Sequence, residues 1–213
     1  MTLADIDVEA AREALAVFGA FQTDETDPTG PGTLLLLGPR EPGFWSNFTQ
    51  SKEWRDGEPD PMDRWSKRVI GKLADRFGAK AYFPFGTPLH PFMSWAIRSG
   101  RAWSSPVQLL VHDTAGLLVS YRGALHVDAL LDLPETGEPP CETCVSRPCL
   151  KACPAAALGE NTYDLAACHA FLDTPSGGNC MAKGCQVRRA CPISQSYGRM
   201  DAQSAFHMER FHR

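Results

Sequence analysis

The sequence lacks several features that would assign a function class at once. None of its apolar runs approaches the length needed to cross a membrane, and the run at 34–37 is only strand-sized. Its opening, MTLADIDVEA, has neither the basic nor the apolar region of a secretory signal peptide. With a net charge of -4, it also lacks the basic excess expected of a nucleic-acid-binding protein. We therefore expect a soluble, cytoplasmic protein that binds neither membranes nor nucleic acid.

Common catalytic motifs are missing as well. The chain has no glycine-rich phosphate loop, no dinucleotide fingerprint and no serine or cysteine nucleophile motif. Cysteine is absent from the first 140 residues, and all eight cysteines fall between Cys141 and Cys191. This segment is therefore the most informative part of the chain.

The cysteines form two runs that both end in Cys-Pro. The first reads C-x2-C-x4-C-x3-C-P from Cys141, and the second reads C-x11-C-x4-C-x5-C-P from Cys168. Two [4Fe–4S] clusters need eight thiolates, and in two-cluster ferredoxin modules the cysteine before the proline ligates the other cluster. This rule predicts two ligand sets, each borrowing one cysteine from the other run: Cys141, Cys144, Cys149 and Cys191, and Cys153, Cys168, Cys180 and Cys185.

Zinc and disulfides are the alternatives. Four-cysteine zinc sites also use C-x2-C pairs, but this chain has only one such pair and two zinc sites would favour several. Four disulfides would suit a secreted protein. The spacing is also unusual for clusters, because four residues separate Cys144 from Cys149 where two are usual. One iron could therefore have a different ligand.

Composition and periodicity divide the chain into three parts. We expect an α/β domain for a cofactor or substrate at 1–138, a ferredoxin-like double-cluster module at 139–195, and a C-terminal helix that packs back on the body at 196–213. Helices are predicted at 8–19, 61–77 and 92–98, with Asp60 capping the second, and an aromatic loop at 39–48. Strands are predicted at 33–37, 79–85, 107–112, 117–121 and 124–130. The module should contain a short helix at 153–158 and a helix capped by Asp164. This order indicates an α+β chain with a mixed-sheet α/β sandwich.

Three segments resemble epoxyqueuosine reductase. They are SPVQLLVHDTAGLLVSYRGALHVD at 105–128, DLAACHAFLDT at 164–174 and the closing CMAKGCQVRRACP. The N-terminal part is also similar to the cobalamin-processing protein involved in combined methylmalonic aciduria and homocystinuria. The resemblance implies a nitroreductase-like domain that can hold a corrinoid and receive single electrons from the clusters.

The chain departs from that family in two respects. The family's catalytic acid would align near 85–88, where this sequence has no carboxylate. The chain also has no counterpart of the family's C-terminal repeat domain for tRNA. We therefore do not expect queuosine synthesis, and no residue is assigned a catalytic role.

The main hypothesis is an iron–sulfur oxidoreductase. Two clusters would take single electrons from a donor such as a flavodoxin or a ferredoxin reductase. The clusters would pass these electrons to a cofactor in the N-terminal domain, and this cofactor would reduce a small substrate. A corrinoid is the preferred cofactor and FMN is the weaker choice. The alternatives are a ferredoxin-like relay to a partner protein and a protein that reduces or processes cobalamin.

A planar cofactor should be lined by aromatic and polar residues at loop–strand junctions. The predicted pocket residues are Phe44, Trp45, Phe85, His90, His112 and Arg122, with Phe83, Pro88 and Trp95 beside them. Each aromatic could instead belong to the core. Two of the polar residues also have purely structural interpretations. His112 could serve only to hold the turn that follows it, and Arg122 could form a surface ion pair.

Overall fold

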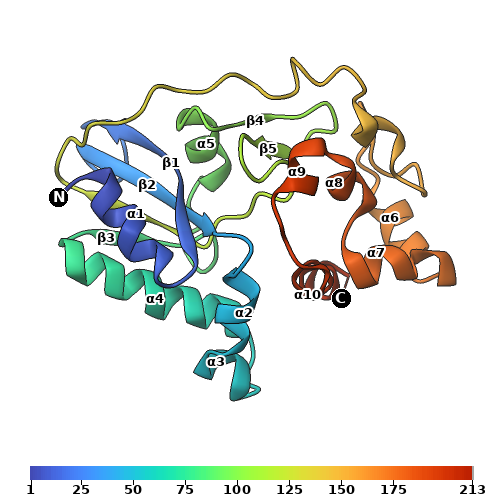
Figure 1. Ribbon diagram of the computed structural model, residues 1–213, viewed down its shortest axis with the longest axis horizontal. Coiled ribbons are helices and arrows are strands. Elements are labelled where there is room, and N and C mark those ends of the chain that lie inside the picture. Colours follow the sequence, from blue (N-terminus) through green and yellow to red (C-terminus); the bar gives the residue numbers. More distant parts are fainter. Residues whose placement is uncertain (213) are drawn as a thin grey trace. The chain divides into compact units, whose positions relative to one another are not determined.

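The computed structural model describes residues 1–212, which divide into two compact units (Figure 1). The N-terminal unit contains residues 1–101 and 120–137, and the cysteine unit contains residues 102–119 and everything described from residue 138 onward. The chain is of the α+β class, as the sequence predicts. Residues 102–119 belong to the same unit as the cysteines, although the sequence predicts them in the first domain. Within residues 1–212, no helix combines the length and the apolar character that a membrane span requires.

The N-terminal unit is built on a four-stranded sheet. Its elements are α1 (Leu3–Ala11), β1 (Leu15–Thr23), β2 (Gly32–Pro39), α2 (Phe44–Thr49), α3 (Lys52–Arg55), α4 (Pro61–Phe77), β3 (Lys80–Tyr82), α5 (Phe92–Arg98) and β6 (Gly123–Val127). The strand order is β1-β2-β6-β3, and every neighbouring pair is antiparallel, so the predicted mixed sheet is wrong. Helix α4 does join two strands that run in the same direction, β2 and β3. However, β6 inserts between them and pairs with both.

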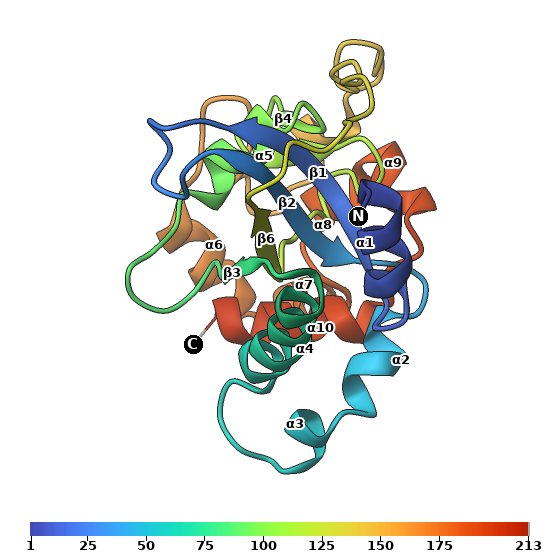
Figure 2. The same ribbon diagram turned by 90° about the vertical axis from the view of Figure 1, so that its left-hand side faces the viewer.

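Helices cover both faces of this sheet. The central strand β2 is buried at all eight positions, which is expected only when neither face is open to water. Gly123 of β6 lies against α4 and is paired with Leu37, whereas Gly19 of β1 lies against the end of α5 and is paired with Leu36. Because successive residues of a strand point to opposite faces, α4 and the end of α5 lie on opposite sides of the sheet (Figure 2).

The start of the chain differs from the prediction of one helix at 8–19. Helix α1 ends at Ala11, Ala14 adopts a left-handed conformation with φ of 53°, and β1 begins at Leu15. Strand β1 then pairs along its length with β2, so long-range pairing outweighs the helical spacing of the apolar residues. The sequence signal for the true helix is the capping box formed by Thr2 and Asp5.

The segment predicted as an aromatic loop at 39–48 contains helix α2. Phe44 and Phe48 are fully buried, and the Phe44 ring lies 5.3 Å from the Trp65 ring of α4 in an edge-to-face arrangement. Trp45 makes a similar contact with Trp54 of α3, also at 5.3 Å between ring centroids. Because so short a helix is marginal alone, this aromatic packing is what stabilises α2.

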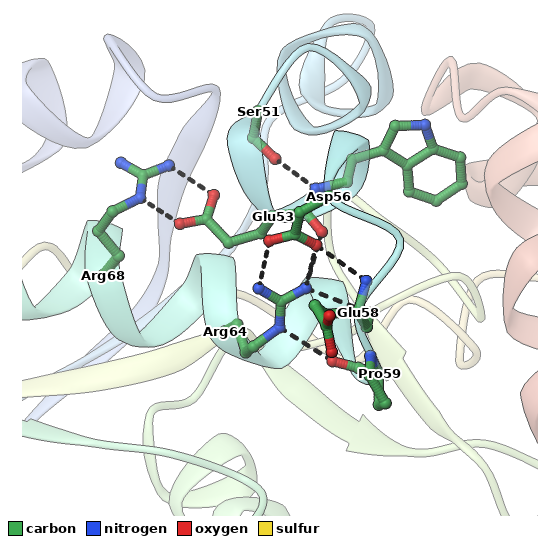
Figure 3. A network of polar contacts seen from close by, with 8 residues as sticks. Ser51, Glu53, Asp56, Glu58, Pro59, Arg64 and Arg68 are labelled. Atoms are coloured by element: carbon green, nitrogen blue, oxygen red, sulfur yellow. Dashed lines mark hydrogen bonds and ion pairs between the residues drawn. The ribbon is translucent and has the colours of Figure 1, made fainter.

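Two arginines of α4 hold α3 and the loop after it (Figure 3). Arg68 donates to both carboxylate oxygens of Glu53, with an Nε–Oε1 distance of 2.6 Å and an Nη2–Oε2 distance of 3.0 Å. Arg64 donates to both oxygens of Asp56 at 2.8 and 2.7 Å. Glu53 is only 4% exposed, and the hydrogen bond from Arg68 lowers its pKa. The Glu53–Arg68 contact therefore joins a buried carboxylate to a partly exposed guanidinium.

Several other predicted elements of this unit are confirmed. Helices α4 and α5 have the predicted bounds, and the strands expected at 33–37, 79–85 and 124–130 correspond to β2, β3 and β6. Asp60 precedes α4, but it adopts a left-handed conformation and its side chain makes no capping hydrogen bond. Pro61 alone marks the start of the helix, since its missing N–H costs nothing at the first position.

The cysteine unit combines a β-hairpin with short helices. Its elements are β4 (Ala102–Ser104), β5 (Leu110–His112), η1 (Pro148–Lys151), α6 (Leu165–Leu172), η2 (Pro175–Gly177), α7 (Gly178–Lys183), α8 (Gln186–Ala190), α9 (Pro192–Ser196) and α10 (Asp201–Phe211). As predicted, the side chain of Asp164 caps α6 and accepts a hydrogen bond from the Ala167 N–H at 2.9 Å. Helix α10 occupies most of the predicted C-terminal helix and packs against α7, while residue 213 lies outside the described residues.

Two predicted elements of this unit are absent from the described residues. The expected strand at 117–121 does not form because side chains bind its backbone groups: Ser194 Oγ accepts from the Leu117 N–H, and Arg188 donates to the Leu117 carbonyl. The expected helix at 153–158 is interrupted at Ala156, which adopts a left-handed φ of 50°. Residues 117–119 and 153–158 lie in irregular structure of the cysteine unit.

Candidate functional site

The eight cysteines lie on short elements joined by turns. None of them forms a disulfide in the structure. They are distributed as follows: Cys141 and Cys144 in the turns before η1, Cys149 within η1, Cys153 just after it, Cys168 on α6, Cys180 on α7, and Cys185 and Cys191 at the two ends of α8.

Four of the thiols line one cavity of about 510 Å³ in the cysteine unit. These are the four that the Cys-Pro rule assigns to one cluster: Cys141, Cys144, Cys149 and Cys191. The rest of the lining is largely apolar, including Val111, Leu117 and several prolines. The cavity therefore brings three cysteines of the first run together with the last cysteine of the second run.

The other four thiols form a second group. Burial raises the pKa of Cys168, and the neighbouring thiols Cys185, Cys153 and Cys180 raise it further. Cys153 belongs to the first run, whereas the other three belong to the second. Each group thus contains one cysteine from the other run.

The position of Cys191 follows from the chain around it. Pro192 starts α9, so the chain must leave α8 at Cys191 in an extended conformation. The N–H of Leu117 donates to Ser194 Oγ at 2.9 Å, which fixes the segment that follows Cys191. Gly116 lies so close that a Cβ there would approach the Ser194 nitrogen to 2.6 Å and the Cys191 sulfur to 3.1 Å. Residues 116–117 therefore form the wall behind this thiol.

The surroundings of two thiols in the first group, Cys141 and Cys149, favour the neutral form. Burial is the main cause that raises the pKa of Cys141 and of Cys149, and neighbouring thiols add to it in both cases. The charge of Arg147 lowers the pKa of Cys141, and a hydrogen bond from the backbone amide of Leu150 lowers the pKa of Cys149, but burial outweighs both. Since metals bind thiolates, loading this site would release protons.

The six residues predicted to line the cofactor pocket do not all lie in one unit. Phe44 and Trp45 are buried in the aromatic core of the N-terminal unit. His112 belongs to the cysteine unit, is fully buried, and accepts hydrogen bonds at Nδ1 from the N–H groups of Thr114 and Ala115. This contact holds the turn after β5.

The remaining three predicted residues are partly exposed in the N-terminal unit. The ring of Phe85 lies 5.3 Å from that of Phe83, and the ring of His90 stacks on Trp95 at 5.7 Å. Arg122 donates from Nε to the Tyr121 carbonyl at 3.1 Å. Burial lowers the pKa of Arg122, although Asp63 opposes this effect.

Two residues beside the thiols were not found by sequence reasoning. Gln186 donates from Nε2 to the sulfur of Cys180 at 3.6 Å, and Ser105 lines the cavity of the first group. Gln186 directly follows a cysteine, which is a weak signal. Ser105 is distant in sequence from every cysteine, so only the folded chain reveals it.

Among residues 1–212, no three or more histidine, cysteine, aspartate or glutamate side chains converge closely enough to hold a single metal ion. A zinc ion draws four donors to within about 2.3 Å of one point. A [4Fe–4S] cluster binds each thiolate through a different iron, so its ligands surround a volume instead of meeting at a point. The four thiols of the first group line a cavity of about 510 Å³.

Comparison with known proteins adds no assignment. No protein-family model matches the chain. A search of curated proteins likewise finds no significant match.

Proposed function

We propose that this protein is an iron–sulfur electron carrier with two [4Fe–4S] clusters. Cys141, Cys144, Cys149 and Cys191 would hold the first cluster, and Cys153, Cys168, Cys180 and Cys185 would hold the second. The observation that carries the proposal is the cavity lined by the first four thiols, three from one run and one from the other. A disulfide framework would pair the sulfurs, and the cysteines are all free.

The clusters would supply one-electron transfer. The protein's own contribution would be to surround the first cluster with apolar side chains such as Val111 and Ile193, and to place Arg147 near its ligands. Low exposure to water and nearby charge are two of the properties that set the potential of such clusters. The acceptor could be a partner protein or a cofactor bound by the N-terminal unit.

A metal and sulfide analysis tests this proposal. The full chain would be reconstituted anaerobically with iron and sulfide, and iron, zinc and acid-labile sulfide would be counted per chain. We expect about eight irons and about eight sulfides, with the broad visible absorption of reducible cubanes. A colourless protein that holds about two zinc ions would overturn the proposal.

We further propose that the acceptor is a corrinoid bound by the N-terminal unit. The specific support is aromatic surface: Phe85 and His90 are partly exposed rings, each packed on a second ring, and the Lys67 ammonium lies 5.6 Å from the centre of the Phe85 ring. Exposed rings of this kind suit a planar ligand. The resemblance to epoxyqueuosine reductase points to the same class of cofactor.

Titration of the reconstituted protein with hydroxocobalamin and, separately, with FMN tests this second proposal. A cobalamin spectral shift, followed by cobalt reduction when dithionite is added, is the expected result. Tight binding of FMN alone would replace the corrinoid with a flavin. If neither cofactor binds, the protein is a relay to a partner. A bound alkylcobalamin that loses its alkyl group would indicate cobalamin processing.

A further inference from the structure

Ser105 is a buried polar residue whose hydroxyl has no hydrogen-bond partner among the residues that the structure describes. The residue is 6% exposed, and it lines the same cavity as the four thiols of the first group. A buried hydroxyl without a partner is uncommon in folded proteins, because it loses its hydrogen bonds to water and gains none in return. Ser105 therefore belongs to the cavity wall and carries a hydroxyl that has no partner among the described residues.

The backbone holds Ser105 firmly. Its N–H donates to the Leu109 carbonyl at 2.9 Å, and its own carbonyl accepts from the Gln108 N–H at 2.9 Å. These two bonds close the loop between β4 and β5, and Val107 inside that loop is fully buried. Both backbone groups of Ser105 are satisfied, so only the hydroxyl is left over.

Other hydroxyl groups near the cavity already have partners. Thr143, which also lines it, donates to the Pro140 carbonyl at 3.3 Å. Ser194 accepts from the Leu117 N–H. Ser105 differs from both, because its hydroxyl makes no hydrogen bond of either kind while its backbone is held on both sides.

We propose that the Ser105 hydroxyl donates a hydrogen bond to a sulfur atom of the first cluster, either a bridging sulfide or a ligand thiolate. This inference rests on the proposed function. Reduction adds negative charge to the cluster and its sulfurs, so a hydrogen bond to sulfur stabilises the reduced state more than the oxidised state. Ser105 thereby raises the potential of the first cluster without being one of its ligands.

The test compares Ser105→Ala with Ser105→Thr in the full, reconstituted chain. Ser105→Ala removes the hydroxyl, and Ser105→Thr keeps it. A potentiometric titration followed by electron paramagnetic resonance would give the midpoint potential of each cluster. We expect one midpoint to move to a lower potential in Ser105→Ala, the other to stay, and Ser105→Thr to resemble the unmodified chain. Ser66→Ala is the matched control, because Ser66 is a buried serine of α4 whose hydroxyl already donates to the Met62 carbonyl at 2.7 Å, and it should leave both midpoints in place.

Equal midpoints in Ser105→Ala and the unmodified chain would overturn the inference while leaving the two-cluster assignment intact. If Ser105→Ala fails to assemble the first cluster and Ser105→Thr assembles it, the hydroxyl is needed and the inference is supported. If both variants lose that cluster, the site needs the size of serine and the inference is wrong. An unmodified chain that binds no iron would remove the proposed function and this inference together.

Discussion

Replacing Cys191 with alanine should remove the first cluster, although Cys191 lies at the end of the second run. The reason is its place on the cavity beside Cys141, Cys144 and Cys149. Each cluster contains four irons, so iron per chain should fall from about eight to about four, and acid-labile sulfide should fall in parallel. Alanine is preferred to serine for this test, because a serine oxygen can bind iron.

A double-variant cycle makes the same prediction sharper. Cys141→Ala combined with Cys191→Ala should retain about four irons, no fewer than either single variant, because the proposal assigns both cysteines to one cluster. Cys168→Ala combined with Cys191→Ala should retain almost none, because the proposal assigns these two cysteines to different clusters. Iron and sulfide analysis with spin counting would measure this, and far-ultraviolet circular dichroism would show that the variants are folded. Cys180 and Cys191 belong to the same run but to different proposed ligand sets. If the double variant Cys180→Ala with Cys191→Ala retained about four irons, each run would hold its own cluster, and the interleaved assignment would be refuted.

Three further predictions follow from other contacts. Gly116→Ala should lower the iron content to about four per chain, because the added Cβ would clash with the segment that contains Cys191. Gly159→Ala is the control: a Cβ added there has no neighbour within 4 Å, so the iron content should not change. Gln186→Leu should move one cluster midpoint to a lower potential by removing the donor to the Cys180 thiolate, and an unchanged pair of midpoints would contradict this. Arg68→Leu should lower the free energy of unfolding in urea by about 2 kcal/mol, less than for a fully buried pair because Arg68 is 27% exposed. The pKa of Glu53 is lowered in the folded protein, so this pair stabilises the fold above the unfolded pKa of glutamate and loses its effect as pH falls through the folded pKa. Stability of the unmodified chain should thus decline more steeply with acid than that of Arg68→Leu.

The elements that could be predicted from the sequence are those whose signals are local. Helix α4 has Pro61 at its first position, a regular apolar face and Gly78 at its end, and its bounds were predicted correctly. Strand β1 was missed because its apolar residues also fit helical spacing and only its pairing with β2 decides the outcome. The segment 117–121 looks like a strand in isolation, but Arg188 and Ser194 bind its backbone. Those partners are far away in sequence.

In the candidate site, too, the features with local sequence signals could be predicted and those that depend on long-range contacts could not. The cysteine count and the two Cys-Pro endings predict two ligand sets, and this assignment stays a prediction. The structure shows that the first four thiols line one cavity. The aromatic pocket was harder to predict, since composition does not distinguish core rings such as Phe44 from exposed rings such as Phe85. Ser105 could not be found from sequence, because its significance depends on a missing hydrogen bond in the folded chain.

The path of the chain restricts how this protein can be dissected. The polypeptide passes from one unit to the other three times, after residues 101, 119 and 137, so no single cut releases either unit intact. A fragment that begins at residue 138 would carry all eight cysteines, yet it would lack Ser105, Val111 and Leu117 from the cavity wall. Such a fragment should expose its thiols to oxygen and oxidise rapidly. A functional minimal version would need the 102–119 insert grafted back onto it.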